Sequence, residues 1–296
     1  MLCQPKSPVL PSAEATWLRA RRAAGLPDRP GLPLRSRWRN GSRFSAHEWN
    51  AWSPPEPIVW LKKMDEPRAC VAYLRIWKSA SEAVIATLDG AAKASGGRLR
   101  AQRRRPQPSQ CPRAVRFSVV RDPLSHFVAG FAELVWRLRG ELGAKTVDEA
   151  LARQFVVALL DGELPPRAWP ASPRLPYSLH LAPQAGALRI EKRFPIKGGF
   201  LDYVVPLEQI GDGWAEAMAR TGVPDLRGAR LAQCETHSKD HGPCAAQGDP
   251  QGARAALRAV LKGSAPLRRG VCELLRVDYE WLGACNYSMA RCVGEN

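Results

Sequence analysis

ACVAYLRIWKSASEAVIATL, residues 69–88, and FSVVRDPLSHFVAGFAEL, residues 117–134, decide the fold of this chain. Each stretch begins with a short apolar run typical of a strand, passes through a polar turn with one cation, and continues with apolar residues at helical spacing. A strand that leads into a helix in this way presents free backbone N–H groups and the positive end of the helix dipole, where anions bind. The sequence therefore predicts anion sites at Lys78 and Arg121 on neighbouring strands. Such a pair suits a nucleotide phosphorylated at both ends.

Outward from these stretches, strand patterns alternate with helix patterns. Pro123 suits the first turn of a helix, and the helix after Lys78 is expected to end at Gly96 and Gly97. The pattern predicts strands at 70–76, 114–120 and 200–205, and helices at 83–95, 123–138, 147–160, 207–220, 253–261 and 267–281. Alternation of this kind predicts an α/β fold in which helices flank a parallel sheet, with the ligand at the carboxyl ends of the strands.

Two segments lack a sustained period. Residues 1–66 are rich in Pro, Arg and Trp, so we expect an irregular N-terminal arm with one short helix at 13–24, ahead of a domain at 67–296. Residues 98–116 carry seven arginines and no acid. That basic segment is either a loop that grips a polyanion or a solvated insert.

The composition favours anionic partners. Lys and Arg outnumber Asp and Glu to give a net charge of +16, which attracts acidic glycans, nucleotides or nucleic acids. The alternative is that a genome-wide bias towards Arg inflates this charge. No apolar run approaches the roughly 20 residues that cross a bilayer, and the first 30 residues lack the apolar core of a signal peptide.

The eight cysteines form an even set. Cys234 with Cys244 and Cys285 with Cys292 are candidate local disulfides, which would fit an oxidising compartment, and the alternative is buried free thiols. The chain has no CxxC or Cys/His spacing that argues for zinc. We therefore expect no metal.

Read as RIWKSASEAVI and VVRDPLSHFVAGF, the two opening stretches resemble the sulfotransferases, in particular the carbohydrate sulfotransferases and their algal and protist relatives. Those proteins carry a lysine turn of the type IPKxxST or IWKxGST and a later strand ending in VRDPxxRxxSxY. Three further stretches match the family in the same order: HLAPQ at 180–184, LDYVVPLEQI at 201–210 and CELLRVDYEWLG at 272–283. Each match alone is a weak pattern, and their order makes the resemblance specific.

The resemblance implies a P-loop-like sulfotransferase fold and the donor 3′-phosphoadenosine 5′-phosphosulfate. It implies that Lys78, Ser79, Ala80 and Ser81 surround the 5′-phosphosulfate, and that Arg121 holds the 3′-phosphate. The acceptor would be a hydroxyl of an acidic or neutral glycan, with no nucleic acid partner expected, and the compartment would be the Golgi lumen or membrane. The acceptor itself and the oligomeric state stay open.

The chemistry assigns roles to these residues. Lys78 would neutralise charge on the leaving phosphate and on the transferred group. A general base must take the acceptor proton, and His180 is the first candidate and Glu208 the second. Asp278 and Tyr279 are expected to hold the last helix in place.

Three positions depart from the family pattern. Glu82 stands where relatives have Ser or Thr, and its carboxylate would compete with phosphate for the positive helix end. Ala129 replaces a serine that shares the 3′-phosphate, unless Ser125 substitutes for it, and His126 replaces a second arginine.

Two alternatives to an active sulfotransferase follow. One is a polyanion-binding protein that keeps the fold without catalysis, which Glu82 and Ala129 favour. The other is a nucleotide kinase, disfavoured because the chain has no GxxxxGK[ST] motif.

Overall fold

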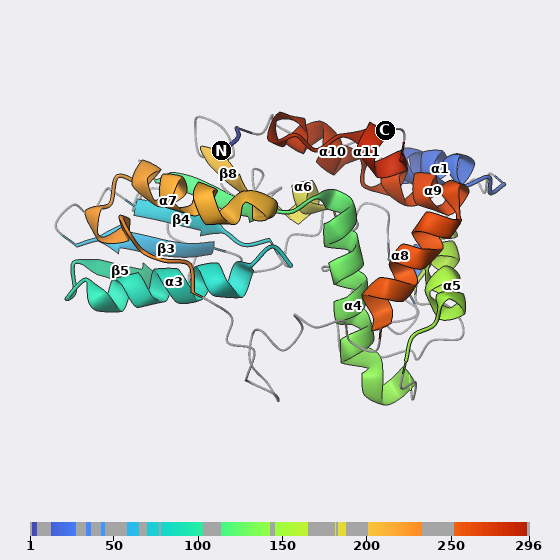
Figure 1. The fold of residues 1–296 in the computed structure, drawn as a ribbon, viewed down its shortest axis with the longest axis horizontal. Coiled ribbons are helices and arrows are strands. Elements are labelled where there is room, and N and C mark those ends of the chain that lie inside the picture. Colours follow the sequence, from blue (N-terminus) through green and yellow to red (C-terminus); the bar gives the residue numbers. More distant parts are fainter. Residues whose placement is uncertain are drawn as a thin grey trace.

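We analysed a computed structural model of the chain. The structure describes residues 2–4, 13–27, 34–36, 43–44, 58–64, 70–76, 78–102, 114–142, 146–164, 181, 183–187, 201–232 and 252–294. These residues form a sheet with helices packed against it and a larger helical part to one side (Figure 1).

A five-stranded sheet carries the fold. Its strands lie in the order β5 (Leu99–Gln102), β3 (Ile58–Lys63), β4 (Cys70–Leu74), β6 (Val115–Val120) and β8 (Tyr203–Pro206). The pairs β4–β6 and β6–β8 are parallel, whereas β3 runs antiparallel to both of its neighbours. The prediction of an α/β fold with a parallel sheet flanked by helices is thus confirmed for the three strands that it named.

One face of the sheet is covered by α3 (Ser81–Ala94) and α7 (Ile210–Arg220). Alternate strand residues such as Tyr73, Phe117 and Val205 point to this face, because successive side chains of a strand alternate in direction. They pack with Leu88 of α3 and Trp214 of α7 in one hydrophobic cluster. As predicted, the glycine pair follows the end of α3, with Gly96 and Gly97 both at positive φ.

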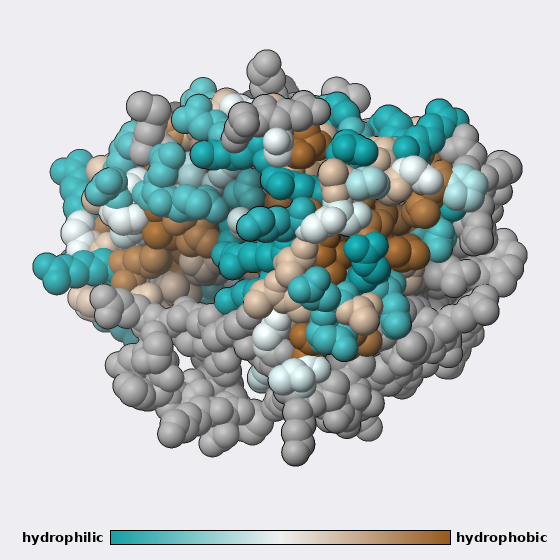
Figure 2. Space-filling view, turned by 45° about the vertical axis from the view of Figure 1, so that its right-hand side comes forward, coloured by the Kyte–Doolittle hydropathy of each residue, from teal (hydrophilic) through white to brown (hydrophobic). Residues whose placement is uncertain are grey.

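The other face belongs to a second hydrophobic cluster, shared with the helical part. Ala72, Leu74 and Val204 contribute from the strands. The helices in this part are α1 (Ala13–Ala23), α4 (Pro123–Leu142), α5 (Glu149–Leu160), α8 (Ala253–Gly263), α9 (Ala265–Leu274), α10 (Arg276–Leu282) and α11 (Met289–Val293). In the space-filling view, hydrophilic residues form a band across one face, with hydrophobic residues gathered on both sides of it (Figure 2).

The helices differ from the predicted ones mainly at two boundaries. The predicted helix at 267–281 is broken at Leu275, which separates α9 from α10. The predicted helix at 207–220 begins with a 3-10 turn at Leu207–Gln209 before α7. Within the described part of the chain, no helix has the length and apolarity that crossing a membrane requires.

The N-terminal arm contributes to the core. Its predicted short helix is α1, where buried Trp17 donates from Nε1 to the carbonyl of Leu159 at 2.9 Å and buried Arg21 pairs with Asp161. The strand β3 also lies on the N-terminal side of residue 66 and sits between β4 and β5. The boundary between an arm at 1–66 and a domain at 67–296 stays a prediction. A second small sheet has the order β2 (Arg43–Phe44), β1 (Leu34–Ser36) and β7 (Glu163–Leu164).

The basic segment at 98–116 was expected to form a loop or insert, and for its first residues this is wrong. Residues 99–102 form β5, because Leu99 is buried and the strand completes an antiparallel pairing with β3. Residues 103–113 of the segment lie outside the described part of the chain.

The disulfides connect distant parts of the chain. Cys285 pairs with Cys3 and Cys292 pairs with Cys272, so the predicted local bridge between Cys285 and Cys292 is wrong. Cys3 reaches its partner because it lies along β8, where its backbone exchanges two hydrogen bonds with Val204. Cys70 is disulfide-bonded as well, so the alternative of free thiols is wrong for the described cysteines. The candidate pair Cys234 and Cys244 lies outside the described residues.

We predict that the two bridges stabilise the fold unequally, because a cross-link over a longer loop removes more entropy from the unfolded chain. The separations are 20 residues for Cys272–Cys292 and 282 for Cys3–Cys285. Replacing the first pair by serine should lower the free energy of unfolding by about 3 kcal/mol, and replacing the second by about 5 kcal/mol. Urea denaturation of the two double variants checks the order, and a larger loss for the short loop would contradict it.

Candidate functional site

The carboxyl ends of β4 and β6 place the two predicted cations at one edge of the sheet. The strands are parallel neighbours, with Tyr73 opposite Phe117, so the chain leaves both at the same edge. Lys78 follows β4 and Arg121 directly follows β6. The Arg121 Nη1 donates to the Lys78 carbonyl oxygen at 3.5 Å, across a separation of 43 residues. The structure therefore brings together the two residues on which the sequence interpretation rests.

The lysine turn has an unusual backbone. Lys78 and Ala80 have φ values of 65° and 55°, in the left-handed region that non-glycine residues rarely adopt and that costs roughly 1–3 kcal/mol per residue. Left-handed residues in such turns direct successive N–H groups to one side and form concave anion sites. The helix α3 begins at Ser81, and its N-cap residue, Ala80, makes no side-chain capping hydrogen bond. The turn thus presents backbone donors and the helix dipole together.

The side chains of this turn are held from within the protein. Ser79 is buried, and its Oγ donates to Gln184 Oε1 at 3.4 Å. Ser81 Oγ accepts from Arg75 Nε at 3.3 Å, and the same guanidinium pairs with Glu82. The Glu82 carboxylate therefore has its own cation, which reduces the competition with a bound anion that the sequence led us to expect.

Lys78 makes an ion pair that sequence reasoning missed. Its Nζ lies 2.6 Å from Glu133 Oε2, and the side chains are 19% and 4% exposed, respectively. Glu133 belongs to α4, where its neighbours Phe131, Ala132 and Leu134 are buried in the core. The signal that could have revealed it is a single acid inside an otherwise apolar helical stripe.

Gln184 joins the edge of the sheet to the C-terminal helices. Its side chain accepts from the Arg121 N–H at 2.9 Å and donates to the Arg121 carbonyl at 2.7 Å. The backbone N–H groups of Gln184 and Ala185, in α6 (Gln184–Ala187), donate to Asp278 at 2.8 and 2.7 Å. This confirms that Asp278 anchors the last part of the chain. His180, the first candidate base, lies outside the described residues.

Arg121 lies among other charges. Burial lowers its pKa, Glu208 opposes that effect, and repulsion from Arg254 and Arg258 lowers the pKa further. Both of those arginines lie on α8, which packs against α4, and they are four residues apart on one helical face. Sequence reasoning missed them because they lie more than a hundred residues after Arg121. These two further positive charges on α8 raise the positive potential around Arg121, which favours binding of an anion.

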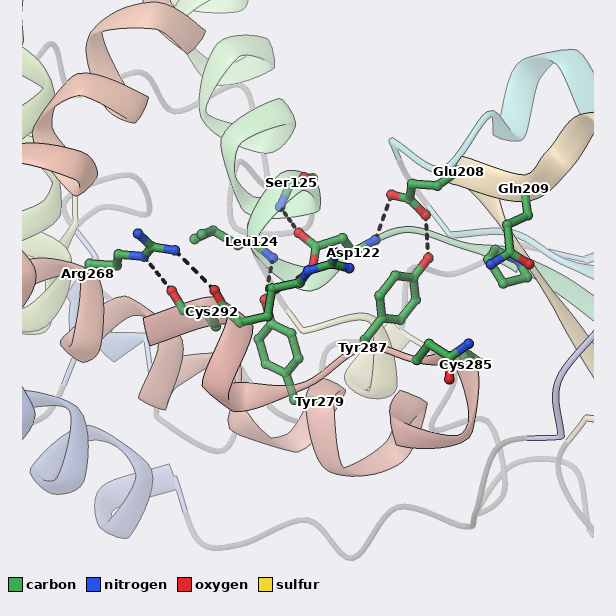
Figure 3. A pocket seen from close by; sticks show the side chains of 13 residues that line it. Asp122, Leu124, Ser125, Glu208, Gln209, Arg268, Tyr279, Cys285, Tyr287 and Cys292 are labelled. Carbon is green, nitrogen blue, oxygen red and sulfur yellow. Dashed lines mark hydrogen bonds between the residues drawn. The ribbon is translucent and has the colours of Figure 1, made fainter. Parts of the chain in front are cut away.

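A cavity of about 400 Å³ adjoins this site at the ends of β6 and β8 (Figure 3). Glu208, the second candidate base, lines it and accepts from the Asp122 N–H at 3.0 Å and from the Tyr287 hydroxyl. Burial raises the pKa of Tyr287, as does its hydrogen bond to Glu208, so this hydroxyl keeps its proton. Ser125 lines the cavity too, from the first turn of α4. The Tyr279 hydroxyl accepts from the Leu124 N–H at 3.2 Å, so Tyr279 holds α10 against α4, as expected.

The other two departures from the family pattern are buried. Ala129 is 2% exposed and His126 is 1% exposed, and both lie in the first half of α4. Neither lines the cavity beside Asp122. The positions at which relatives carry a serine and a second arginine therefore supply no phosphate ligand in this conformation.

We predict that Asp278 sets a pH dependence of stability. Burial raises the pKa of its carboxyl to about 7 from the ordinary 3.8, an effect that the hydrogen bonds from Ala185 and Gln184 partly offset. The folded protein holds this proton more tightly than the unfolded chain does. Protonation of Asp278 therefore contributes fully to the free energy of unfolding below about pH 4, and this contribution is lost as pH rises to about 7. Asp278→Asn removes this contribution.

The advantage of the wild type over Asp278→Asn in free energy of unfolding should therefore shrink between pH 4 and 7 and then stay constant. Urea denaturation of both proteins across this range checks it. Asp278→Ala, which leaves two backbone N–H groups without their acceptor, should cost at least about 2 kcal/mol at any pH. An advantage that grows with pH would contradict the assignment.

Among the described residues, no group of three or more His, Cys, Asp or Glu side chains is arranged to hold a metal ion. Comparison of the chain with protein-family models, with curated proteins and with solved structures found no match.

Proposed function

We propose that the protein is a sulfotransferase that moves a sulfuryl group from 3′-phosphoadenosine 5′-phosphosulfate to a hydroxyl of a carbohydrate acceptor. The observation that carries the proposal is the placement of the left-handed Lys78 turn and Arg121 side by side at one edge of parallel strands. The order of sequence motifs that resembles the sulfotransferases supports it. So does the succession of strand, turn and helix around Lys78, which we propose to be part of a P-loop-like sulfotransferase fold.

In this proposal the turn binds the 5′ end of the donor. The backbone N–H groups of Ser79, Ala80 and Ser81 face the phosphosulfate, and Lys78 supplies the mobile charge. The bond from sulfur to the phosphate oxygen breaks while a bond from sulfur to the acceptor oxygen forms. Lys78 stabilises the charge that develops on the leaving phosphate.

Arg121 binds the 3′-phosphate, with Arg254 and Arg258 as additional donors. These two arginines take over the role of the serine that relatives place where this chain has the buried Ala129. Ser125 lies in the adjoining cavity and stays a candidate ligand.

A carboxylate or imidazole must accept the acceptor proton. Glu208 is one candidate, and two hydrogen bonds hold its carboxylate in place. His180 remains the other candidate. The disulfides fit an oxidising compartment such as the Golgi lumen, which we include in the proposal.

A second candidate function is non-catalytic binding of a polyanionic glycan. The ion pair of Lys78 with Glu133 favours it, because the main cation of the turn already has a partner. The net charge of +16 also supports it.

Nucleotide binding separates the two functions. We expect adenosine 3′,5′-bisphosphate, at a hundred times its dissociation constant, to stabilise the protein by about 2.7 kcal/mol in a thermal shift assay. Lys78→Ala should abolish most of this effect, because it removes the charge at the turn. The control is Lys93→Ala, which replaces an exposed lysine in the last turn of α3, the helix that follows the Lys78 turn. No shift at millimolar nucleotide, together with binding of a sulfated polysaccharide, would support the second function instead.

A separate prediction concerns the proposed 3′-phosphate site. Arg258→Ala should weaken adenosine 3′,5′-bisphosphate roughly tenfold, since a charged hydrogen bond contributes about 1.5–3 kcal/mol, and should leave adenosine 5′-phosphate unchanged. Isothermal titration calorimetry measures both ligands, and Lys262→Ala, one turn further along α8, is the control. Equal losses for the two nucleotides would place the 3′-phosphate elsewhere.

A further inference from the structure

Lys78, the central residue of the proposed function, is paired with the buried carboxylate of Glu133. Glu133 is 4% exposed and lies 2.6 Å from the ammonium of Lys78. It projects from α4, among side chains of the hydrophobic core, where an ionised group loses the hydration that water provides. The fold alone does not require this arrangement, because an apolar residue of similar size would fill the space at lower cost.

The pair also bears on ligand binding. A lysine ammonium offers three donors and moves on a flexible stem, so it can turn from one anion to another. In the structure its rotamer is fixed by Glu133, which belongs to the helix that follows Arg121. An anion that binds at the turn must therefore share the Lys78 ammonium with Glu133 or displace Glu133 from it.

We propose that Glu133 is a positioning residue that fixes the direction of the Lys78 side chain and that competes with the nucleotide for its ammonium. The inference rests on the proposed function, because it assumes that the turn binds the 5′ end of a nucleotide. Glu133 thereby regulates affinity: its carboxylate weakens nucleotide binding and at the same time fixes the position of Lys78. Removal of the negative charge should therefore tighten nucleotide binding.

The first measurement tests the pair without any ligand. Lys78→Met should lower the urea midpoint strongly in the wild type, where it takes a cation from the buried carboxylate, and much less in the Glu133→Gln background. Equal shifts in the two backgrounds mean that the residues are not coupled, and they would overturn the inference. Glu133→Met, which fills similar space without charge, repeats the cycle if the glutamine variant is poorly folded.

The second measurement is calorimetric titration with adenosine 3′,5′-bisphosphate. Glu133→Gln should bind it about tenfold more tightly than the wild type, because the Lys78 ammonium no longer has to give up an ion pair with a buried carboxylate in order to bind the phosphate. Glu133→Asp, which keeps the charge, should stay close to the wild type. The gain should vanish when Lys78→Met is added.

The outcomes distinguish the inference from the function beneath it. Binding by the wild type with unchanged or weaker binding by Glu133→Gln would overturn the competition and leave the function standing. Binding only by Glu133→Gln would support both. Failure of every variant to bind nucleotide would overturn the proposed function and this inference with it, even if the stability cycle shows that the two side chains are coupled.

Discussion

The parallel pairing of β4 with β6 is the constraint on which the rest of the structure depends. It makes two loops leave the sheet at one edge, and so brings residues 43 positions apart within hydrogen-bond distance. Gln184 fixes that edge by pairing with the backbone of Arg121 on both sides. Asp278 fixes Gln184 in turn, so the C-terminal helices hold this edge in place.

The unfavourable features of the molecule gather at this edge. Two non-glycine residues have left-handed backbones, a carboxylate is buried in the core beside a lysine, and a second carboxyl is buried at Asp278. Arg121 also feels the repulsion of Arg254 and Arg258, which lowers its pKa. Each of these features costs stability, whereas the rest of the fold follows simple patterns. Natural proteins concentrate such exceptions at functional sites. This concentration is the physical basis for placing the site here.

Much of the fold could be predicted from local periodicity. The runs that begin at Cys70, Val115 and Tyr203 are mostly apolar because both faces of the parallel sheet are buried. The apolar stripe of α4 is buried as predicted. β3 and β5 were missed, because they lie in Pro-rich and Arg-rich sequence and gain their strand structure from pairing with each other and with β4. The disulfides, Glu133, Arg254 and Arg258 depend on contacts between distant segments, which no local pattern records.

We propose that Lys78 and Arg121 bind opposite ends of one nucleotide. A crystal structure of the protein grown with adenosine 3′,5′-bisphosphate tests it most directly. We expect the 5′-phosphate on the N–H groups that follow Lys78 and the 3′-phosphate on the Arg121 guanidinium, with the nucleoside spanning the ends of β4 and β6. A nucleotide that binds away from this edge, or that places both phosphates on one of the two cations, would contradict it.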